Sequence, residues 1–514
     1  MRADFPYNSL FSPNARLKNR FTPSDLLPEM IRLLSLARVF GLMLMVFSLT
    51  YLLPIITSEL FRDGTAMLFA EDMSLTLGIG IFLWFSTRRF QREFKAKDGF
   101  LLVVLAWTGM AAFATFPLMS YLKDLSFTDA YFETMSGLTT TGATVLAGLD
   151  QLPPAINLWR HELNWLGGMG IIVLAVAILP VLGIGGRQLF MAETPGPMKD
   201  SKLAPRITET AKNLWLVYAG ITAVCVLALK YAGMSWFDAV CHAFATMGLG
   251  GFSTHDSSIG YFNSPAIEGV LILFMLIAGM NFATHFVALR TRSLTHYKHD
   301  IEVAPYLFLL VVSCLGVAFY LWFNGAYEDY GTALRHTGFN LISIATDCGF
   351  ASTDFGQWPL FAPLWMLFLS CISVCTGSTG GGIKMMRTLI LVKQSQLQMF
   401  VLTHPTAVNP LKLGGLVISS NIIFSVLGFI FVYFMSVVIL TLILVISGMD
   451  FITSFSAIVA TINNAGPGLG QVGPSSNYLG LTDFQTWTCT VAMFLGRIEV
   501  FTALILFTPA YWRK

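Results

Sequence analysis

Four stretches of this 514-residue chain repeat one pattern of residue types around a glycine. They are DAYFETMSGLTTTGAT from Asp129, DAVCHAFATMGLGGFST from Asp238, HTGFNLISIATDCGFAST from His336 and TSFSAIVATINNAGPG from Thr453. Each shared glycine follows the first residue of its stretch by 13 positions: Gly142, Gly251, Gly349 and Gly466. The second and third stretches also continue alike, as GFSTHD and GFASTD. The sequence therefore contains four copies of one unit, which is typical of a repeat architecture.

A glycine turn of this kind can present main-chain carbonyl oxygens to a cation. A monovalent cation entering a bilayer must exchange its water for other oxygens, and rings of backbone carbonyls do so in potassium filters. Glycine reaches the necessary dihedral angles at little cost. One such glycine would more simply be loop punctuation, but four at matched offsets favour a shared site. The residues before the glycines differ widely in side chain, which favours main-chain ligands; the predicted carbonyl donors are Thr140, Thr141, Leu249, Gly250, Asp347, Cys348, Asn464 and Ala465.

The composition is that of a membrane protein. Apolar residues make up 55% of the chain and charged residues 12%, about half the charge of a typical soluble protein. The net charge of +2 does not suggest nucleic acid as a partner. The seven cysteines show no metal-ligand or disulfide spacing and are expected to be small buried hydrophobes. Apolar runs long enough to cross a bilayer as helix predict ten spans: 37–58, 66–86, 99–120, 157–183, 212–232, 264–290, 303–323, 361–392, 411–447 and 484–511.

The basic residues predict the orientation of these spans. With the N-terminus inside, 25 of the 31 Lys and Arg residues face the cytoplasm, including those of the 184–212 loop, and both termini are then cytoplasmic. The four repeated stretches fall in the long outside connections. Each has about ten semi-apolar residues before its glycine, too few to span, and is predicted to be a re-entrant half-helix beside a shared cavity. Residues 1–36 lack the apolar core of a signal peptide, so no segment is expected to be removed.

A second glycine cluster interrupts the eighth predicted span. The segment SVCTGSTGGGIKMMR, residues 373–387, contains Gly377, Gly380, Gly381 and Gly382. Each interior glycine costs a helix about 1 kcal/mol relative to alanine, so the helix should break here. A phosphate-binding loop is excluded because Ile383 separates the last glycine from Lys384 and no strand precedes it. A simple kink is the alternative to a functional loop.

Charged residues near these segments are further candidates. Arg497 falls in the middle of the tenth span, where a charge is costly and by default marks a functional site. Its alternative is a structural ion pair, although Glu499 at i+2 does not share a helix face with it. Asp256 and Asp354 follow their glycines by five residues and either attract cations to an outer vestibule or cap the loops. The adjacency of His255 and Asp256 does not make a catalytic dyad.

The motifs SGLTTTGAT, GGFSTHD, DCGFASTDF and NNAGPGLG resemble the four pore loops of the Trk/Ktr/HKT superfamily of potassium transporters. The likeness covers about residues 30–512, and two extra N-terminal helices make the chain most similar to the bacterial Trk-type membrane subunit. The second loop departs from the family in reading GLGG where a threonine-rich stretch is common. Some plant relatives have serine in the first loop and pass sodium, so Gly142 favours potassium.

The resemblance implies an all-α fold with four helix–pore-loop–helix repeats around a pseudo-fourfold pore. It also implies a homodimer in the bacterial inner membrane, potassium as the bound and transported ion, and a regulatory ring of Rossmann-like nucleotide-binding domains on the cytoplasmic face. No organic cofactor is expected. In the family a flexible loop lies beneath the filter as a gate, which corresponds here to Gly377, Gly380, Gly381, Gly382 and Lys384, and the matching arginine, Arg497, faces the pore.

The expected organisation follows the repeats: a cytoplasmic segment 1–36, a helix pair 37–98 and pore repeats 99–211, 212–302, 303–410 and 411–514. The predicted function is potassium uptake through a gated, channel-like pore. Sodium permeation, or coupling of potassium to sodium or protons, keeps the same fold and stays open. A membrane-embedded enzyme is the alternative of another class, and the spans offer no nucleophile, base or metal cluster for it.

Overall fold

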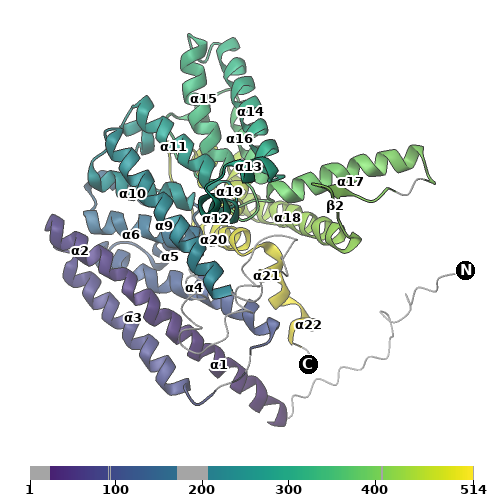
Figure 1. The fold of residues 1–514 in the computed structure, drawn as a ribbon. Coiled ribbons are helices and arrows are strands. Elements are labelled where there is room, and N and C mark those ends of the chain that lie inside the picture. The colour runs from purple at the N-terminus through teal and green to yellow at the C-terminus, as the bar shows by residue number, and fades with distance from the viewer. Residues whose placement is uncertain (1–22, 91, 93, 171–206, 407–408, 513–514) are drawn as a thin grey trace, which may run out of the picture.

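The computed structural model describes residues 23–90, 92, 94–170, 207–406 and 409–512 (Figure 1). This part is almost entirely helical, with one two-stranded hairpin. It contains six helices long and apolar enough to cross a membrane, or eight if each of two bent helix pairs is one span. Phe308, Phe424 and Phe431 are among many large apolar side chains exposed on these helices, and such wide apolar surfaces mark contact with lipid. The expected all-α polytopic fold is confirmed.

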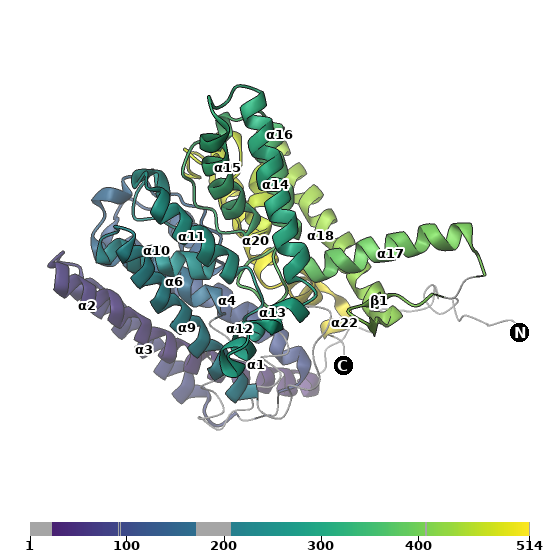
Figure 2. The same ribbon diagram turned by 45° about the horizontal axis from the view of Figure 1, so that its top comes forward.

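The N-terminal helices form one side of the molecule in both Figure 1 and Figure 2 (purple). Helix α1 (Pro23–Ser48) continues through η2 (Leu49–Tyr51) into α2 (Leu52–Phe61), and α3 (Ala66–Thr87) packs along α1. The two backbones approach most closely where a methyl group on Gly80 would lie 2.9 Å from the carbonyl oxygen of Gly41. Small residues permit such close helix contacts within membranes.

Helix α1 starts well before the expected boundary at residue 37. The predicted cytoplasmic segment 1–36 is therefore helical from Pro23, and residues 1–22 lie outside the described part. Arg32 is buried, and its guanidinium contacts the Asp98 carboxylate at 2.7 Å and the Tyr511 hydroxyl at 2.8 Å. The charge that marked this stretch as polar is neutralised inside the protein, so the helix continues through it.

The four repeats each contain a first helix, a short helix of 12 to 16 residues and a second helix. The first helices are α4 (Ala96–Tyr121), α9 (Ile207–Tyr231), α14 (Val303–Phe323) and α18 (Ser420–Ile446). The short helices are α5 (Phe127–Leu138), α10 (Trp236–Gly248), α15 (Tyr330–Ala345) and α19 (Phe451–Ile462). The second helices are α6 (Pro154–Gly168), α11 (Pro265–Ala278), α16 (Phe361–Ile372) and α20 (Asp483–Arg497).

Every short helix begins at an equivalent N-cap. The capping side chain accepts a hydrogen bond from the amide three residues on in each case; the caps are Ser126, Ser235, Asp329 and Asp450. Serine and aspartate are favoured at this position because they satisfy amides that have no partner within the helix. The cap lies 16 residues before the glycine of the turn in the first, second and fourth repeats and 20 residues before it in the third, where α15 is longer.

Two predicted spans are not continuous. Helices α11 and α12 (Phe282–Thr291) are bent by 97°, so the predicted span 264–290 is broken between Ala278 and Phe282. Helix α20 and the segment Val500–Phe507, which contains α21 (Val500–Leu504) and η8 (Ile505–Phe507), are bent by 109°, so the predicted span 484–511 is broken after Arg497. Asn281 caps the new start of α12, and Glu499 has a left-handed φ of 57° at the second bend.

The remaining elements connect the repeats. Helix α13 (Thr295–His299) joins α12 to α14, and α17 (Met385–Thr403) extends away from the body of the molecule in both ribbon views (Figures 1 and 2). The expected span 411–447 is wrong at its start, because β1 (Lys412–Leu413) and β2 (Leu416–Val417) pair around two glycines of positive φ. Short elements complete the fold: η3 (Leu149–Gln151), η5 (Ser258–Tyr261), η6 (Phe355–Gln357), η7 (Gly470–Val472) and α22 (Pro509–Trp512).

Two sequence predictions fall on residues that the structure does not describe. The end of the predicted span 157–183 and most of the basic 184–212 loop lie in 171–206. The C-terminal Arg513 and Lys514 lie outside the described residues as well.

The contact between α1 and α3 predicts a difference between two neighbouring glycines of α3. Gly80→Ala should lower the melting temperature of the purified protein, since the added methyl group would lie 2.9 Å from the Gly41 carbonyl oxygen and overpacking costs about 1–3 kcal/mol. Gly78→Ala is the matched control, because nothing lies within 4 Å of its added methyl group and alanine favours helix. Equal melting temperatures for the two variants would contradict the close contact.

Candidate cation site

The four glycine turns have the same backbone conformation. Two residues before each glycine stands a residue with left-handed φ: Thr140 at 54°, Leu249 at 54°, Asp347 at 64° and Asn464 at 60°. The glycines themselves have φ of 79° at Gly142, 63° at Gly251, 90° at Gly349 and 84° at Gly466. Non-glycine residues rarely adopt positive φ, so four matched cases indicate one turn used four times.

The turns close into a ring. A methyl group on Gly142 would lie closer than 3.0 Å to the carbonyl oxygen of Gly250, in the second repeat. The same holds for Gly251 with the Cys348 carbonyl, Gly349 with the Ala465 carbonyl and Gly466 with the Thr141 carbonyl. The contacts therefore run from the first repeat to the second, third, fourth and back to the first. Any residue larger than glycine would push the neighbouring carbonyl out of place.

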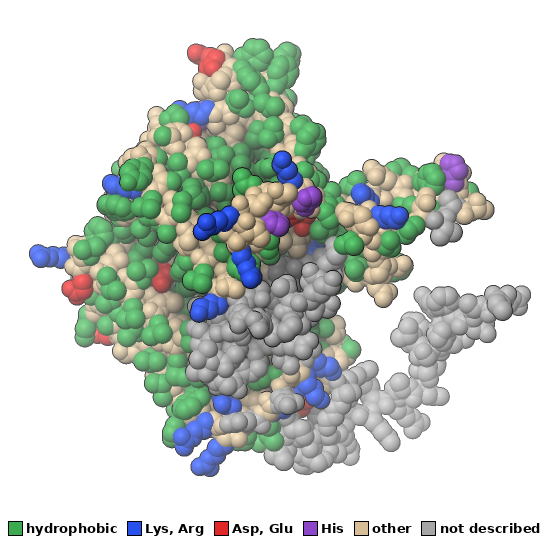
Figure 3. Space-filling model, viewed as in Figure 1, with side chains coloured by type: hydrophobic (Ala, Val, Ile, Leu, Met, Phe, Trp, Pro, Cys, Tyr) green, Lys and Arg blue, Asp and Glu red, His purple; other side chains and the backbone are tan. Residues whose placement is uncertain are grey.

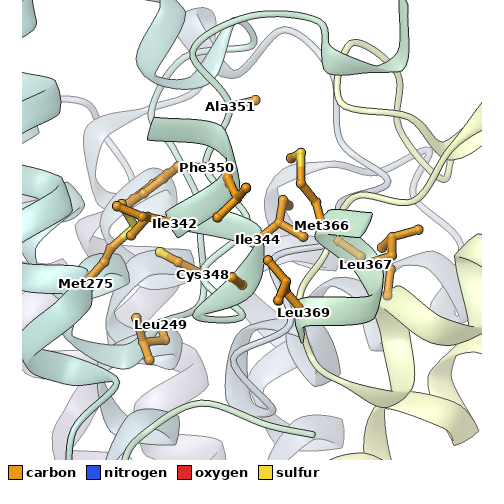
Figure 4. Packing of buried hydrophobic residues seen from close by; sticks show 14 of the residues in the cluster. Leu249, Met275, Ile342, Ile344, Cys348, Phe350, Ala351, Met366, Leu367 and Leu369 are labelled. Carbon is orange, nitrogen blue, oxygen red and sulfur yellow. The ribbon is translucent and has the colours of Figure 1, made fainter. Parts of the chain in front are cut away.

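Side chains of the second and third turns pack into the apolar core. Leu249 and Cys348 are fully buried in the main apolar cluster, beside Met275, Ile342 and Leu369 (Figure 4). The ring thus consists of main chain, with the carbonyls of Thr141, Gly250, Cys348 and Ala465 against the neighbouring glycines. The first residue of each predicted donor pair is the left-handed residue at the base of its turn: Thr140, Leu249, Asp347 and Asn464.

Polar side chains on the short helices hold the extended segment that follows each glycine. They lie nine or ten residues before the glycine and differ in every repeat: Glu133, His242, Asn340 and Ser456. His242 Nε2 lies 2.9 Å from Ser253 Oγ, and the Asn340 amide contacts Ser352 at 3.0 Å. Ser456 Oγ accepts from the Leu469 amide at 2.8 Å. These residues were not predicted from the sequence, although a polar residue nine or ten positions before each repeated glycine is a detectable signal.

The first repeat uses a buried ion pair for this purpose. Glu133 accepts from Arg160 Nε at 2.8 Å, from Thr144 Oγ1 at 2.9 Å and from the Val145 amide at 3.0 Å. Arg160 also donates to the Ser253 carbonyl of the second repeat at 3.3 Å. Both charged side chains are 1% exposed. The pair fixes the extended segment after Gly142 and joins the first repeat to the second.

The glycine-rich loop, residues 373–384, lies against the inner ends of the short helices. Thr379 Oγ1 donates to the Met247 carbonyl at the end of α10 at 3.0 Å. The Gly381 amide donates to Asp347 Oδ2 at 3.0 Å, and a methyl group on Gly381 would lie closer than 3.0 Å to the Asn463 carbonyl oxygen. The loop therefore contacts three repeats directly beneath the ring, and its glycines leave no room for side chains.

This loop also satisfies backbone groups at the bend between α11 and α12. The Cys375 amide donates to the Gly279 carbonyl at 3.0 Å, and the Phe282 amide donates to the Gly377 carbonyl at 3.1 Å. Broken helices persist at membrane depth only where other protein groups satisfy the freed backbone. The bend after α11 and the break after α16 thus stabilise one another. The glycine cluster predicts the break after α16, whereas the bend after α11 depends on contacts with that distant loop.

Arg497 joins the loop to the first repeat. Its Nη1 donates to the Thr379 carbonyl at 2.7 Å, and its Nη2 donates to the Gly167 carbonyl and, at 3.1 Å, to the Gly168 carbonyl. Glu499, which the sequence offered as an ion-pair partner for Arg497, pairs instead with Arg387 at 2.8 Å. Lys384 is buried, and its ammonium donates to the Gly380 carbonyl within the loop. Two cationic side chains therefore lie beside the loop under the ring.

The two acidic candidates that follow their glycines, Asp256 and Asp354, accept hydrogen bonds from loop backbone. Asp256 accepts from the Leu149 amide at 3.1 Å, and Asp354 accepts from the Gly356 amide at 3.0 Å at the start of η6. Both therefore hold loop backbone. His255 bonds Asp150 rather than acting with Asp256, and it stacks on Tyr261 with ring centroids 3.5 Å apart. Burial opposes the charge of His255, but hydrogen bonds to Asp238 and Asp150 raise its pKa above the ordinary value.

The buried pair behind the ring predicts a non-additive result. Glu133→Leu should lower the melting temperature strongly, because it leaves Arg160 buried without its carboxylate at a cost of about 3–5 kcal/mol. The double variant Glu133→Leu with Arg160→Met should recover much of that loss, since it removes both charges. A melting temperature of the double variant below that of Glu133→Leu would show that the Glu133 carboxylate does not offset the cost of burying Arg160.

The chain is similar to known proteins along most of its length. A family model described as cation transport protein, TrkH, matches residues 65–514. The Trk system potassium uptake protein TrkH of Salmonella typhimurium is 45% identical over 484 residues, covering 93% of this chain and 99% of that protein. TrkH of Halomonas elongata is 46% identical over 478 residues, covering 93% and 98%. The crystal structure of the potassium transporter TrkH from Vibrio parahaemolyticus has a TM-score of 0.85 and 43% identity, covering 94% of this chain and 100% of that chain.

The family match extends over all four glycine turns, the glycine-rich loop and Arg497. With its long apolar helices, the molecule is a multi-pass membrane protein. The chain belongs to the TrkH family of cation transport proteins.

Proposed function

We propose that this protein takes up potassium across the inner membrane of a bacterium through a pore whose selectivity filter is the ring of four turns. The observation that carries the proposal is the closed set of glycine-to-carbonyl contacts from Thr141 to Gly466. Carbonyls fixed in this way replace the hydration shell of a permeating ion. The relatives named potassium uptake proteins support potassium as the ion, and the family description favours transport over a membrane enzyme.

The proposed gate is the glycine-rich loop. Its position under the ring, its contacts with three repeats and its hydrogen bond from Arg497 support a barrier that closes the pore below the filter. The loop brings Lys384 and Arg497 close to the expected ion path, and like charges oppose a cation there. Opening requires the loop to leave these contacts, which are made to backbone carbonyls and one carboxylate.

The proposed assembly is a homodimer with both termini in the cytoplasm. A cytoplasmic ring of Rossmann-like nucleotide-binding domains is the proposed regulator, and the relatives' description as parts of a Trk system is consistent with a further component. Figure 3 shows Lys, Arg and His side chains near the middle of one face, around α12 and α13. A basic surface of this kind suits an acidic partner or anionic lipid.

Proteoliposomes containing this chain alone test the proposal. Reversal potentials measured in mixed potassium and sodium, with and without a pH gradient, should follow the potassium gradient. A potential that follows sodium would favour the sodium-permeable alternative, and one that shifts with the pH gradient would favour proton coupling. Absence of any cation flux from folded protein would overturn the proposal.

The ring predicts that Gly142→Ser loses selectivity. The new side chain would displace the Gly250 carbonyl, which lies closer than 3.0 Å to its Cβ position, so the ratio of sodium to potassium permeability should rise by about tenfold, the equivalent of roughly 1.4 kcal/mol. The ratio is measured from reversal potentials under bi-ionic conditions. Gly148→Ser is the matched control, because Gly148 lies outside the ring and nothing lies within 4 Å of its added Cβ. It should keep the permeability ratio of the wild type. An unchanged ratio in folded Gly142→Ser would remove Gly142 from the filter.

The contact between Arg497 and the loop predicts a leaky pore in Arg497→Ala. Removing charge-assisted hydrogen bonds, worth about 1.5–3 kcal/mol each, should raise potassium flux by roughly tenfold or more while the potassium-to-sodium ratio stays near that of the wild type. The ratio is spared because the ring lies elsewhere. Flux and melting temperature are measured on the same preparation. A lower melting temperature with unaltered flux per folded molecule would identify Arg497 as purely structural.

A further inference from the structure

Glu302 sits immediately before α14 and is 3% exposed. A polar side chain at the N-cap position can accept a hydrogen bond from the first amides of its own helix. Glu302 makes no such capping bond. Its Oε2 instead accepts from the amide of Thr376, in the glycine-rich loop, at 2.7 Å. A buried carboxylate is thus directed away from its own helix and toward the loop.

The other neighbours of Glu302 belong to the α12–α13 hairpin. Asp300, which follows α13, accepts from the Glu302 amide at 3.0 Å and from Thr284 Oγ1 of α12 at 2.7 Å. His285 of α12 bonds Tyr297 of α13 at 2.8 Å and the Ile277 carbonyl at 2.9 Å. These bonds join α11, α12, α13 and the start of α14 into one unit that ends at Glu302.

The same hairpin contacts the loop from its other side. The Phe282 amide donates to the Gly377 carbonyl at 3.1 Å, and the Asn281 side chain lies against Gly377. Residues 375–377 are therefore held between the start of α12 and Glu302. Two residues farther along the loop is Thr379, whose carbonyl accepts from Arg497. A displacement of the hairpin is transmitted to the part of the loop that lies under the ring.

The outer surface of the hairpin is exposed in the described part of the chain. Arg290, Arg292, Lys298, Leu289 and Leu294 are exposed there. Figure 3 places basic side chains over this part of the molecule. Basic and apolar side chains together are typical of a contact surface, and this surface lies four residues along the chain from Glu302, whose carboxylate binds the Thr376 amide.

We propose that Glu302 is a positioning residue for the gate, which couples the α12–α13 hairpin to the glycine-rich loop through its hydrogen bond to the Thr376 amide. The inference rests on the proposed function of the loop as gate. A charged carboxylate accepts hydrogen bonds about twice as strongly as a neutral group, so ionised Glu302 holds the loop in the position seen here. Loss of the charge loosens the loop and raises basal flux.

The surroundings of Glu302 give this contact a pH dependence. The ionisable groups that face it are Asp300 and the Cys375 thiol, while α17 presents the Met386 backbone. Burial, followed by the nearby charge of Asp300, raises the pKa of Glu302 to about 7, although the Thr376 amide opposes this shift. Glu302 is therefore charged above about pH 7 and neutral below it. The loop should be held more firmly at pH 8 than at pH 6.

Potassium flux into proteoliposomes of the full chain, with equal pH on both sides, tests the proposal. Wild-type basal flux should rise severalfold between pH 8 and pH 6. Glu302→Gln, nearly isosteric and always neutral, should show the high flux at both pH values, and Glu302→Asp should restore part of the pH response. Glu59→Gln, at an exposed carboxylate of α2, should keep the wild-type profile.

Hydrogen exchange of residues 373–384 at pH 8 gives a second readout that does not depend on transport. Exchange in Glu302→Gln should be about tenfold faster than in wild type, which corresponds to about 1.4 kcal/mol, with the short helices unchanged. A wild-type pH profile and wild-type loop exchange in folded Glu302→Gln would overturn the inference. Wild-type protein without potassium-selective flux would instead overturn the proposed function, so the two failures are distinguishable.

Discussion

The close approach of four glycine backbones to four carbonyl oxygens is the constraint on which the rest of this structure depends. At each point a single methyl group would collide with the neighbouring repeat. The carbonyls can meet around one axis only because these residues have no side chain, and because a left-handed residue stands two positions before each of them. Each short helix begins at a capped residue and ends just before its turn, so the four helices deliver the turns to the ring.

The fourfold pattern belongs to the main chain and not to the side chains that support it. One repeat anchors the segment after its glycine with a buried Glu133–Arg160 pair, and the others use His242, Asn340 or Ser456. All four solutions give buried polar groups a partner, and an unpaired buried polar group is costly. The type of anchoring side chain can vary because the ring depends only on where the anchor holds the main chain.

The glycine-rich loop breaks the symmetry. Only the third repeat contributes it, yet it contacts the inner ends of α10, α15 and α19 and is joined to the first repeat by Arg497. The bend in α11 is stabilised by the same loop. A segment that satisfies the backbone of several repeats cannot move without disturbing them, so a contact at the α12–α13 hairpin has a route to the ring. Glu302 contacts the loop at the Thr376 amide, and Arg497 contacts it at the Thr379 carbonyl.

The sequence by itself determined the class of fold, the four repeats, the glycine of each turn and the break at residues 373–384. These follow from local properties: apolar length, matched spacing and the low helix propensity of glycine. It also marked Arg497, because a charge in an apolar span is costly wherever it lies. Only the tertiary structure decided the bends after Ala278 and Arg497, the partner of Arg160 and the attachment of Glu302 to the loop. Each of these joins residues far apart in the chain, and the free energy of a contact between distant segments depends on geometry that no local pattern of residues contains.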